Sequence, residues 1–395
     1  MKSKELFFAK SVIDQGLVSL SNFLLIIFSA NLLVPQQHGE MSLILSSLFG
    51  VQMINLSLLY GGSFLYLKQK SYSVNYQIFL TAMCSLCALF FSLIFAVAGF
   101  YFGVFSEIET VLIGAIFIFF QLLTDHVRME FYTFKLGSMP ILNSILVYGS
   151  RLIGIYFVTD LNDFLFVLLF SNIFSLPRFS QTFSFNVFRR TDFRQVIVKH
   201  FYLSRHMASS SILNWGWNYL PIFFIGFYHD VVLAGILLSL RCLANIHNPL
   251  TTLLDTYVPS LLYRTKTKDE DKLMFITLYT SMGLWALVLI FLFFYSSDVL
   301  VFTYGNLYES YDYMLIILWI SSGALIFGKN KVLLTRWLGK LSSESTSSFS
   351  AFAVVVIIGL PLIKFYALDG AVLLYLIATL AYMFVIYWKS QNKGR

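Results

Sequence analysis

The stretch FIGFYHDVVLAGILLSLRCLANIHNPLTTLLDTYVPSLLYR, residues 224–264, decides the fold class of this chain. From residue 231 to residue 262 it is almost continuously apolar. At about 1.5 Å of rise per residue, a helix of this length exceeds the roughly 30 Å hydrocarbon thickness of a bilayer. The sequence therefore predicts a single membrane-spanning helix over 231–262.

Polar residues recur inside this predicted helix at steps of four and three. They are Arg241, Asn245, Asn248, Thr252 and Asp255. This spacing places all five on one helix face. An ionised side chain at mid-membrane costs about 2.5–3.5 kcal/mol on insertion scales. We therefore expect Arg241 to face a bundle interior or a water-filled cavity.

The composition indicates that the whole chain, and not only this stretch, belongs to a membrane protein. Its 395 residues are 58% hydrophobic and only 12% charged, and the mean hydropathy is +0.76. These values are typical of an all-α polytopic membrane protein and leave no room for a large aqueous domain. The net charge of +7 does not indicate a nucleic-acid partner, because the basic residues lie between apolar runs and report topology.

Cutting the apolar runs at charged or Gly/Pro-rich breaks predicts twelve spans. They are 12–34, 41–67, 77–102, 110–124, 140–158, 164–176, 210–228, 231–262, 273–296, 311–328, 347–364 and 370–388. If successive connectors alternate between the two sides, 24 of the 27 Lys and Arg residues fall on one side, and only Lys364 falls on the other. By the positive-inside rule, both termini are expected in the cytoplasm.

Two of the inward connectors have a distinctive composition. Residues 185–206 alternate basic residues with Phe, Val, Ile and Tyr, which favours an amphipathic helix along the cytoplasmic interface. A solvated tether between the halves is the alternative. The run SSESTSS at 342–348 is of low complexity and is expected to form a flexible loop.

The two halves of the sequence carry a faint repeat. An offset of 196 residues aligns Gly39 with Gly235, and also Ser63 with Pro259 and Lys70 with Lys266. With six spans on each side of the basic connector, the halves insert in the same orientation. Such parallel repeats are related by a pseudo-two-fold axis along the membrane normal. We expect two six-helix lobes, 1–184 and 209–395, joined by 185–208, with a substrate site at their interface.

This layout resembles the multidrug, oligosaccharide-lipid and polysaccharide exporter superfamily, and within it the polysaccharide flippases of O-antigen and capsule clusters. The residues that carry the resemblance are ANLLVPQQHGEMSLILSS at 30–47, which is similar to the family's R-x-L-x-P-x-x-(F/Y)-G-x-(Y/L)-S segment, and the counterpart at 230–259. The chain departs from that pattern at Asn31, where Arg is frequent, and at His38, where an aromatic residue is commoner.

The resemblance implies a flippase of the bacterial inner membrane that works by alternating access. It would move undecaprenyl-pyrophosphate-linked oligosaccharide units, an O-antigen or capsule repeat, from the cytoplasmic to the periplasmic leaflet. Expected partners are this glycan, membrane lipids, and a polysaccharide polymerase with its chain-length regulator. No enzyme activity, metal, nucleic acid or cofactor is expected apart from a coupling proton or sodium ion.

Two cations within the spans suit an anionic headgroup, because arginine binds phosphate bidentately and stays charged when buried. They are Arg151 and Arg241, one in each half. A carboxylate partner for either arginine is the alternative. Amides at helical spacing are candidate ligands for sugar hydroxyls, although helix-to-helix hydrogen bonding would explain them equally. Apart from Asn245 and Asn248, these amides are Gln52, Asn55, Asn214 and Asn218.

Two acids, Asp14 and Asp255, are candidate sites for the coupling ion. A cation-coupled multidrug or metabolite antiporter of the same superfamily is the first rival function, and it would need such intramembrane acids. A membrane polysaccharide polymerase is a second rival. The resemblance among such polymerases includes a large basic outward loop, whereas the outward connectors here are short and acidic.

Overall fold

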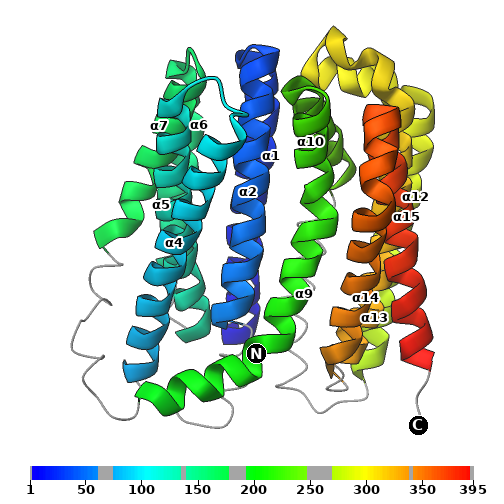
Figure 1. The fold of residues 1–395 in the computed structure, drawn as a ribbon. Coiled ribbons are helices and arrows are strands. Elements are labelled where there is room, and N and C mark those ends of the chain that lie inside the picture. Colours follow the sequence, from blue (N-terminus) through cyan, green and yellow to red (C-terminus); the bar gives the residue numbers. More distant parts are fainter. Residues whose placement is uncertain are drawn as a thin grey trace. The chain divides into compact units, whose positions relative to one another are not determined.

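The computed structural model describes residues 2–60, 74–134, 139–177, 193–246, 269–337 and 341–391. In this part of the chain there are twelve α-helices and no strand (Figure 1). The helices are α1 (Lys2–Leu32), α2 (Pro35–Tyr60), α4 (Val74–Phe102), α5 (Ile108–Phe134), α6 (Met139–Gly154), α7 (Leu161–Asn172), α9 (Phe193–Tyr228), α10 (Val231–Ala244), α12 (Asp269–Tyr304), α13 (Asp312–Trp337), α14 (Leu341–Val354) and α15 (Leu360–Gln391).

Most predicted spans coincide with these helices. Among the described residues, seven segments are long and apolar enough to cross a membrane, and three shorter helical segments are also apolar. The fourth predicted span is longer than expected, since α5 continues to Phe134. The break expected between the last two spans lies inside α15 at Ala367, whose backbone leaves the helical region with φ 46° and ψ −119°. The chain is an all-helical, multi-pass membrane protein, as expected.

The prediction of one helix over 231–262 is wrong. Helix α10 ends at Ala244, and Asn245 caps it with the non-helical angles φ −104° and ψ 16°. Pro249 explains the stop, because its ring would clash with the carbonyl of Asn245 in a continued helix and it has no N–H to donate. The five-residue polar stripe therefore does not continue along one helix. Its members Asn248, Thr252 and Asp255 lie outside the described residues.

The flexible loop expected at 342–348 is also wrong, because these residues belong to α14. Their hydroxyls bond to carbonyls of their own helix, which allows a serine-rich segment to remain helical in apolar surroundings. Thr346 donates to the Ser342 carbonyl at 2.8 Å, Ser347 to Ser343 at 2.9 Å, and Ser348 to Glu344 at 2.9 Å.

The basic connector is helical from Phe193 onward, where it forms the first part of α9. His200 attaches this part to two other helices, through its Nδ1 with the Tyr76 hydroxyl at 2.9 Å and its Nε2 with the Leu58 carbonyl at 2.8 Å. Burial lowers the pKa of His200, so that the neutral ring is favoured there. Val198 and Tyr202 on the same helix are exposed, as an interfacial helix requires. Residues 185–192 lie outside the described part.

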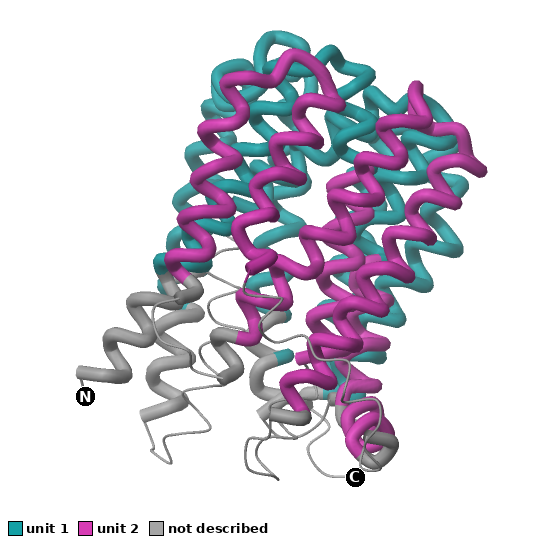
Figure 2. The backbone as a smooth tube through the Cα atoms, turned by 90° about the vertical axis from the view of Figure 1, so that its left-hand side faces the viewer, with its two compact units in different colours: residues 1–43, 216–395 teal, residues 44–215 magenta. Residues whose placement is uncertain are grey.

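The chain divides into two compact units, coloured in Figure 2. Unit 1 comprises Met1–Leu43 with Gly216–Arg395, and unit 2 comprises Ile44–Trp215. The boundaries fall inside α2 and inside α9. The predicted division into lobes 1–184 and 209–395, with 185–208 between them, stays a prediction.

The two glycines aligned by the sequence repeat meet in unit 1, where α2 begins against α10. A Cβ added to Gly39 would overlap the Val231 carbonyl, and one added to Gly235 would lie 3.2 Å from the Gly39 Cα. His38 fastens this contact, since its Nε2 lies 2.9 Å from the Ser239 hydroxyl and its Nδ1 lies 3.0 Å from the Ser29 hydroxyl. The two positions that the sequence repeat aligns are thus direct neighbours.

Candidate functional site

Arg241 lies in the last turn of α10, and the sequence fixes both ends of this short helix. Asp230 caps its start, where the side chain accepts a hydrogen bond from the Val232 N–H at 2.9 Å. Asn245 ends it. Most residues of α10 between these caps are buried, so Arg241 has an apolar helix behind it and is only 8% exposed.

The Arg241 guanidinium is held by uncharged groups of α9 and α15. It donates to the Asn218 backbone carbonyl, to Asn218 Oδ1 at 3.0 Å and to the Tyr375 hydroxyl at 2.8 Å. It also lies over the rings of Tyr375 and Tyr219, at 4.3 Å and 5.1 Å from their centres. Within the described residues no carboxylate contacts it, so the cation keeps a net positive charge in a buried place.

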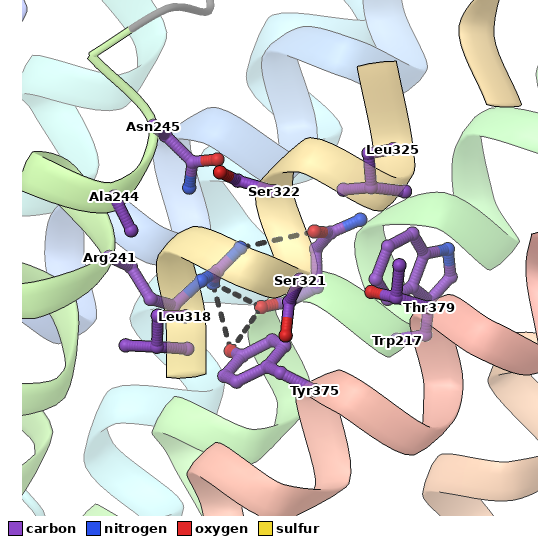
Figure 3. Close-up of a pocket in the computed structure, with 11 residues that line it drawn as sticks. Trp217, Arg241, Ala244, Asn245, Leu318, Ser321, Ser322, Leu325, Tyr375 and Thr379 are labelled. Carbon is purple, nitrogen blue, oxygen red and sulfur yellow. Dashed lines mark hydrogen bonds between the residues drawn. The ribbon is translucent and has the colours of Figure 1, made fainter. Parts of the chain in front are cut away.

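A pocket of unit 1 opens beside this arginine (Figure 3). The space inside it that a water-sized molecule can enter is about 30 Å³. The polar groups around it are hydroxyls and amides, from Asn218, Asn245, Ser321, Ser322 and Thr379. A single cation surrounded by neutral donors and acceptors can donate hydrogen bonds to an anionic group.

Three residues singled out from the sequence meet at this pocket, namely Arg241, Asn218 and Asn245. Tyr375 and the serines of α13 were missed. Tyrosines and serines occur in many of the predicted spans, and the sequence gives no distance between helices. The sequence therefore gave no indication that these residues lie beside Arg241.

Arg151 is more deeply buried than Arg241, at 1% exposed in unit 2. Its guanidinium donates to Ser171 Oγ at 2.9 Å, to Asn172 Oδ1 at 2.9 Å and to Gln121 Oε1. Its carbon also lies 4.9 Å from the centre of the Tyr148 ring. The structure thus surrounds Arg151 with neutral acceptors from α5 and α7, and no carboxylate bonds to it directly within the described part of the chain.

A carboxylate does belong to this network, one residue further away. Gln121 Nε2 donates to Asp125 Oδ1 at 3.2 Å, while Gln52 Nε2 donates to Asp125 Oδ2 at 2.6 Å. Asp125 is 5% exposed. The spacing Gln121-x-x-x-Asp125 on one helical run was the available sequence signal for this pair, because residues four apart share a helix face.

The remaining predicted site residues are dispersed. Asn55 bonds to the Cys84 sulfur at 3.7 Å. Asn214 lies in unit 2, where it donates to Ser210 Oγ at 3.5 Å, and Gln52 contacts Asp125. Asp14 is fully buried in α1. Asn248 and Asp255 lie outside the described residues. The proposed roles of these residues in substrate or ion binding stay predictions.

No protein-family model matches the sequence, and no curated protein matches it. Solved structures do match. An inward-facing multidrug resistance MATE family transporter of the MOP superfamily has a TM-score of 0.74 at 10% identity, over 95% of this chain and 96% of that one. The lipid II flippase MurJ, in an inward closed conformation, has a TM-score of 0.67 at 14% identity, over 98% and 88%.

A eukaryotic MATE transporter has a TM-score of 0.65 at 14% identity, over 99% of this chain and 96% of that one. At such identities the likeness concerns the fold alone. The chain described here has the all-helical fold that MATE transporters and the lipid II flippase MurJ share.

Proposed function

We propose that this protein is a flippase for undecaprenyl-pyrophosphate-linked oligosaccharides and that Arg241 binds the pyrophosphate. The observation that carries the proposal is the pocket of unit 1, in which a buried arginine has only neutral partners among the described residues. An arginine that were merely structural would be expected to have a carboxylate beside it.

The chemistry of the pocket fits the two parts of such a headgroup. A guanidinium donates two parallel hydrogen bonds to phosphate oxygens and stays charged when water is excluded. Hydroxyls and amides such as Ser321, Ser322 and Asn245 exchange hydrogen bonds with sugar hydroxyls. The likeness to a structure named as a lipid II flippase supports a lipid-linked substrate.

The proposal also includes the localisation, the topology and the partners of the protein. The inner membrane of a bacterium, cytoplasmic termini, and cooperation with a polymerase and chain-length regulator follow from the resemblance and from the distribution of basic residues. A coupling proton or sodium ion would supply the driving force.

The test is substitution of Arg241 in cells whose surface glycan depends on this protein. Arg241→Ala is expected to abolish display at normal protein level, and Arg241→Lys to keep part of it. In liposomes with a fluorescent undecaprenyl-pyrophosphate oligosaccharide, the flipping rate of Arg241→Ala should fall about 10- to 100-fold, as expected for the loss of charge-assisted hydrogen bonds.

Arg205→Ala is the matched control, because Arg205 is exposed and stacks on Tyr202 at 4.2 Å in the first part of α9. Its display and flipping should equal those of the natural protein. Unaltered glycan display by Arg241→Ala, at normal protein level, would refute the assignment.

A cation-coupled multidrug antiporter is the second candidate, and buried acids favour it. Asp14, Asp125 and Glu130 are 0%, 5% and 3% exposed, and such carboxylates attract cations. The neighbours named as multidrug resistance MATE transporters share the fold. Resistance to cationic dyes on expression, lost in Asp14→Asn and retained in Arg241→Ala, would favour this candidate over the flippase.

A further inference from the structure

Asp125 is a buried carboxylate without a direct cationic partner. Its two oxygens accept one amide hydrogen bond each, from Gln52 at 2.6 Å and from Gln121 at 3.2 Å. Among the described residues no Lys, Arg or His side chain bonds to it. A carboxylate has about four lone-pair sites, so two amide donors give the charged form less support than a buried ion usually has.

Gln121 is the link between this acid and Arg151. Its carbonyl oxygen accepts from the Arg151 guanidinium, while its amide nitrogen donates to Asp125. The side chain is 2% exposed. The orientation of the amide is therefore set from both ends, by an acceptor at Asp125 and a donor at Arg151.

We infer that Asp125 is a proton-binding site whose occupancy decides whether Gln121 holds Arg151. A proton on the oxygen that faces Gln121 turns this oxygen from an acceptor into a donor. Gln121 then satisfies it by presenting its carbonyl oxygen, which points its NH₂ group at the guanidinium. Two donors would face each other, and Arg151 loses this acceptor.

The surrounding charges fit such a switch. Among the described residues, the titratable or charged groups with which Asp125 interacts are Cys84 on α4, Arg128 on α5 and Arg151 on α6. Helix α2 contributes the amide of Gln52, and α7 contributes Asn172, which bonds to Arg151 and to Thr124. Arg151 is the cation that Gln121 connects to Asp125, so its replacement by a neutral residue should change how readily Asp125 binds a proton.

The consequence for transport rests on the proposed function. A proton bound at Asp125 would release Arg151 for phosphate oxygens, and the charged acid would draw it back through Gln121. Movement of a proton would thereby be linked to movement of the anionic headgroup. Asp125 is thus a third candidate ion site beside Asp14 and Asp255, whose roles stay predictions.

The proton site is tested by infrared difference spectroscopy between acid and alkaline pH on the purified full-length protein in lipid membranes, without substrate. The natural protein should show a protonated-carboxyl band that Asp125→Asn lacks and Asp14→Asn keeps. A band that persists in Asp125→Asn, or that is lost in Asp14→Asn alone, would overturn the assignment. Because no glycan is present, the outcome does not depend on whether the protein is a flippase.

The link through Gln121 is tested by a double-mutant cycle on the same band. Arg151→Gln should shift its titration midpoint, and the shift should be smaller in a Gln121→Leu background. An equal shift in both backgrounds would refute the switch. If Asp125→Asn fails to fold, Asp125→Glu retains the carboxyl and should shift the position of the band; an unshifted band would then count against Asp125.

Discussion

The positively charged side chain of Arg241 lies in the membrane and is bound by uncharged groups. Tyr375 contributes in two ways, since its ring lies 4.3 Å from the guanidinium and its hydroxyl accepts a hydrogen bond at 2.8 Å. The same hydroxyl donates to the Asn218 carbonyl. One phenol therefore joins α9, α10 and α15, and its two contributions can be separated by experiment.

Tyr375→Phe removes the hydroxyl and keeps the ring. We expect a loss of about 1–3 kcal/mol in stability, because a buried charged donor and a buried carbonyl each lose a partner. The midpoint of thermal unfolding in detergent should fall. Tyr156→Phe is the control, since Tyr156 is 88% exposed and its substitution should leave the midpoint unchanged. A midpoint for Tyr375→Phe that matches the control would show that the hydroxyl is dispensable.

At the scale of elements, the crossing of α2 and α10 depends on two glycines. A Cβ on Gly39 would overlap the Val231 backbone carbonyl, which cannot rotate away as a side chain could. Gly39→Ala should therefore push the helices apart and cost about 1–3 kcal/mol. At Gly283 in α12 a Cβ meets nothing within 4 Å, so Gly283→Ala should be neutral or stabilising by up to about 1 kcal/mol. Thermal unfolding of both variants checks the contrast, and equal effects would contradict the close crossing.

The helices show which features of the fold could be predicted from the sequence and which could not. Hydropathy located the helices, because long apolar runs have few alternatives to a membrane span. It failed at α10, which ends at Ala244. The Asn248-Pro249 pair is typical of a helix end, but the long apolar run around it favoured one continuous helix. It failed again at 342–348, because serines that bond to their own helix look like a loop in the sequence. The partners of Arg151 come from α5 and α7. The sequence does not show which side chains of different helices lie within hydrogen-bonding distance.

At the scale of the whole molecule, the basic residues predict the topology. An even number of spans with 24 of 27 Lys and Arg residues on one side predicts that this side faces the cytoplasm. Single cysteines introduced into a variant lacking Cys84, Cys87 and Cys242 can test this by reaction with a membrane-impermeant maleimide on intact cells. Because Ser106 and Asp160 are exposed between helices of unit 2, they are suitable positions on the expected outward side.

Ser106→Cys and Asp160→Cys should react on intact cells, whereas Ser184→Cys should react only after the cells are permeabilised. The physical reason is the cost of moving the basic connector at 177–208, with its six Lys and Arg residues, across the membrane. Reaction of Ser184→Cys from outside, without reaction at the other two positions, would invert the topology. The pyrophosphate would then have to be bound from the opposite leaflet, and the proposed direction of transport would be reversed.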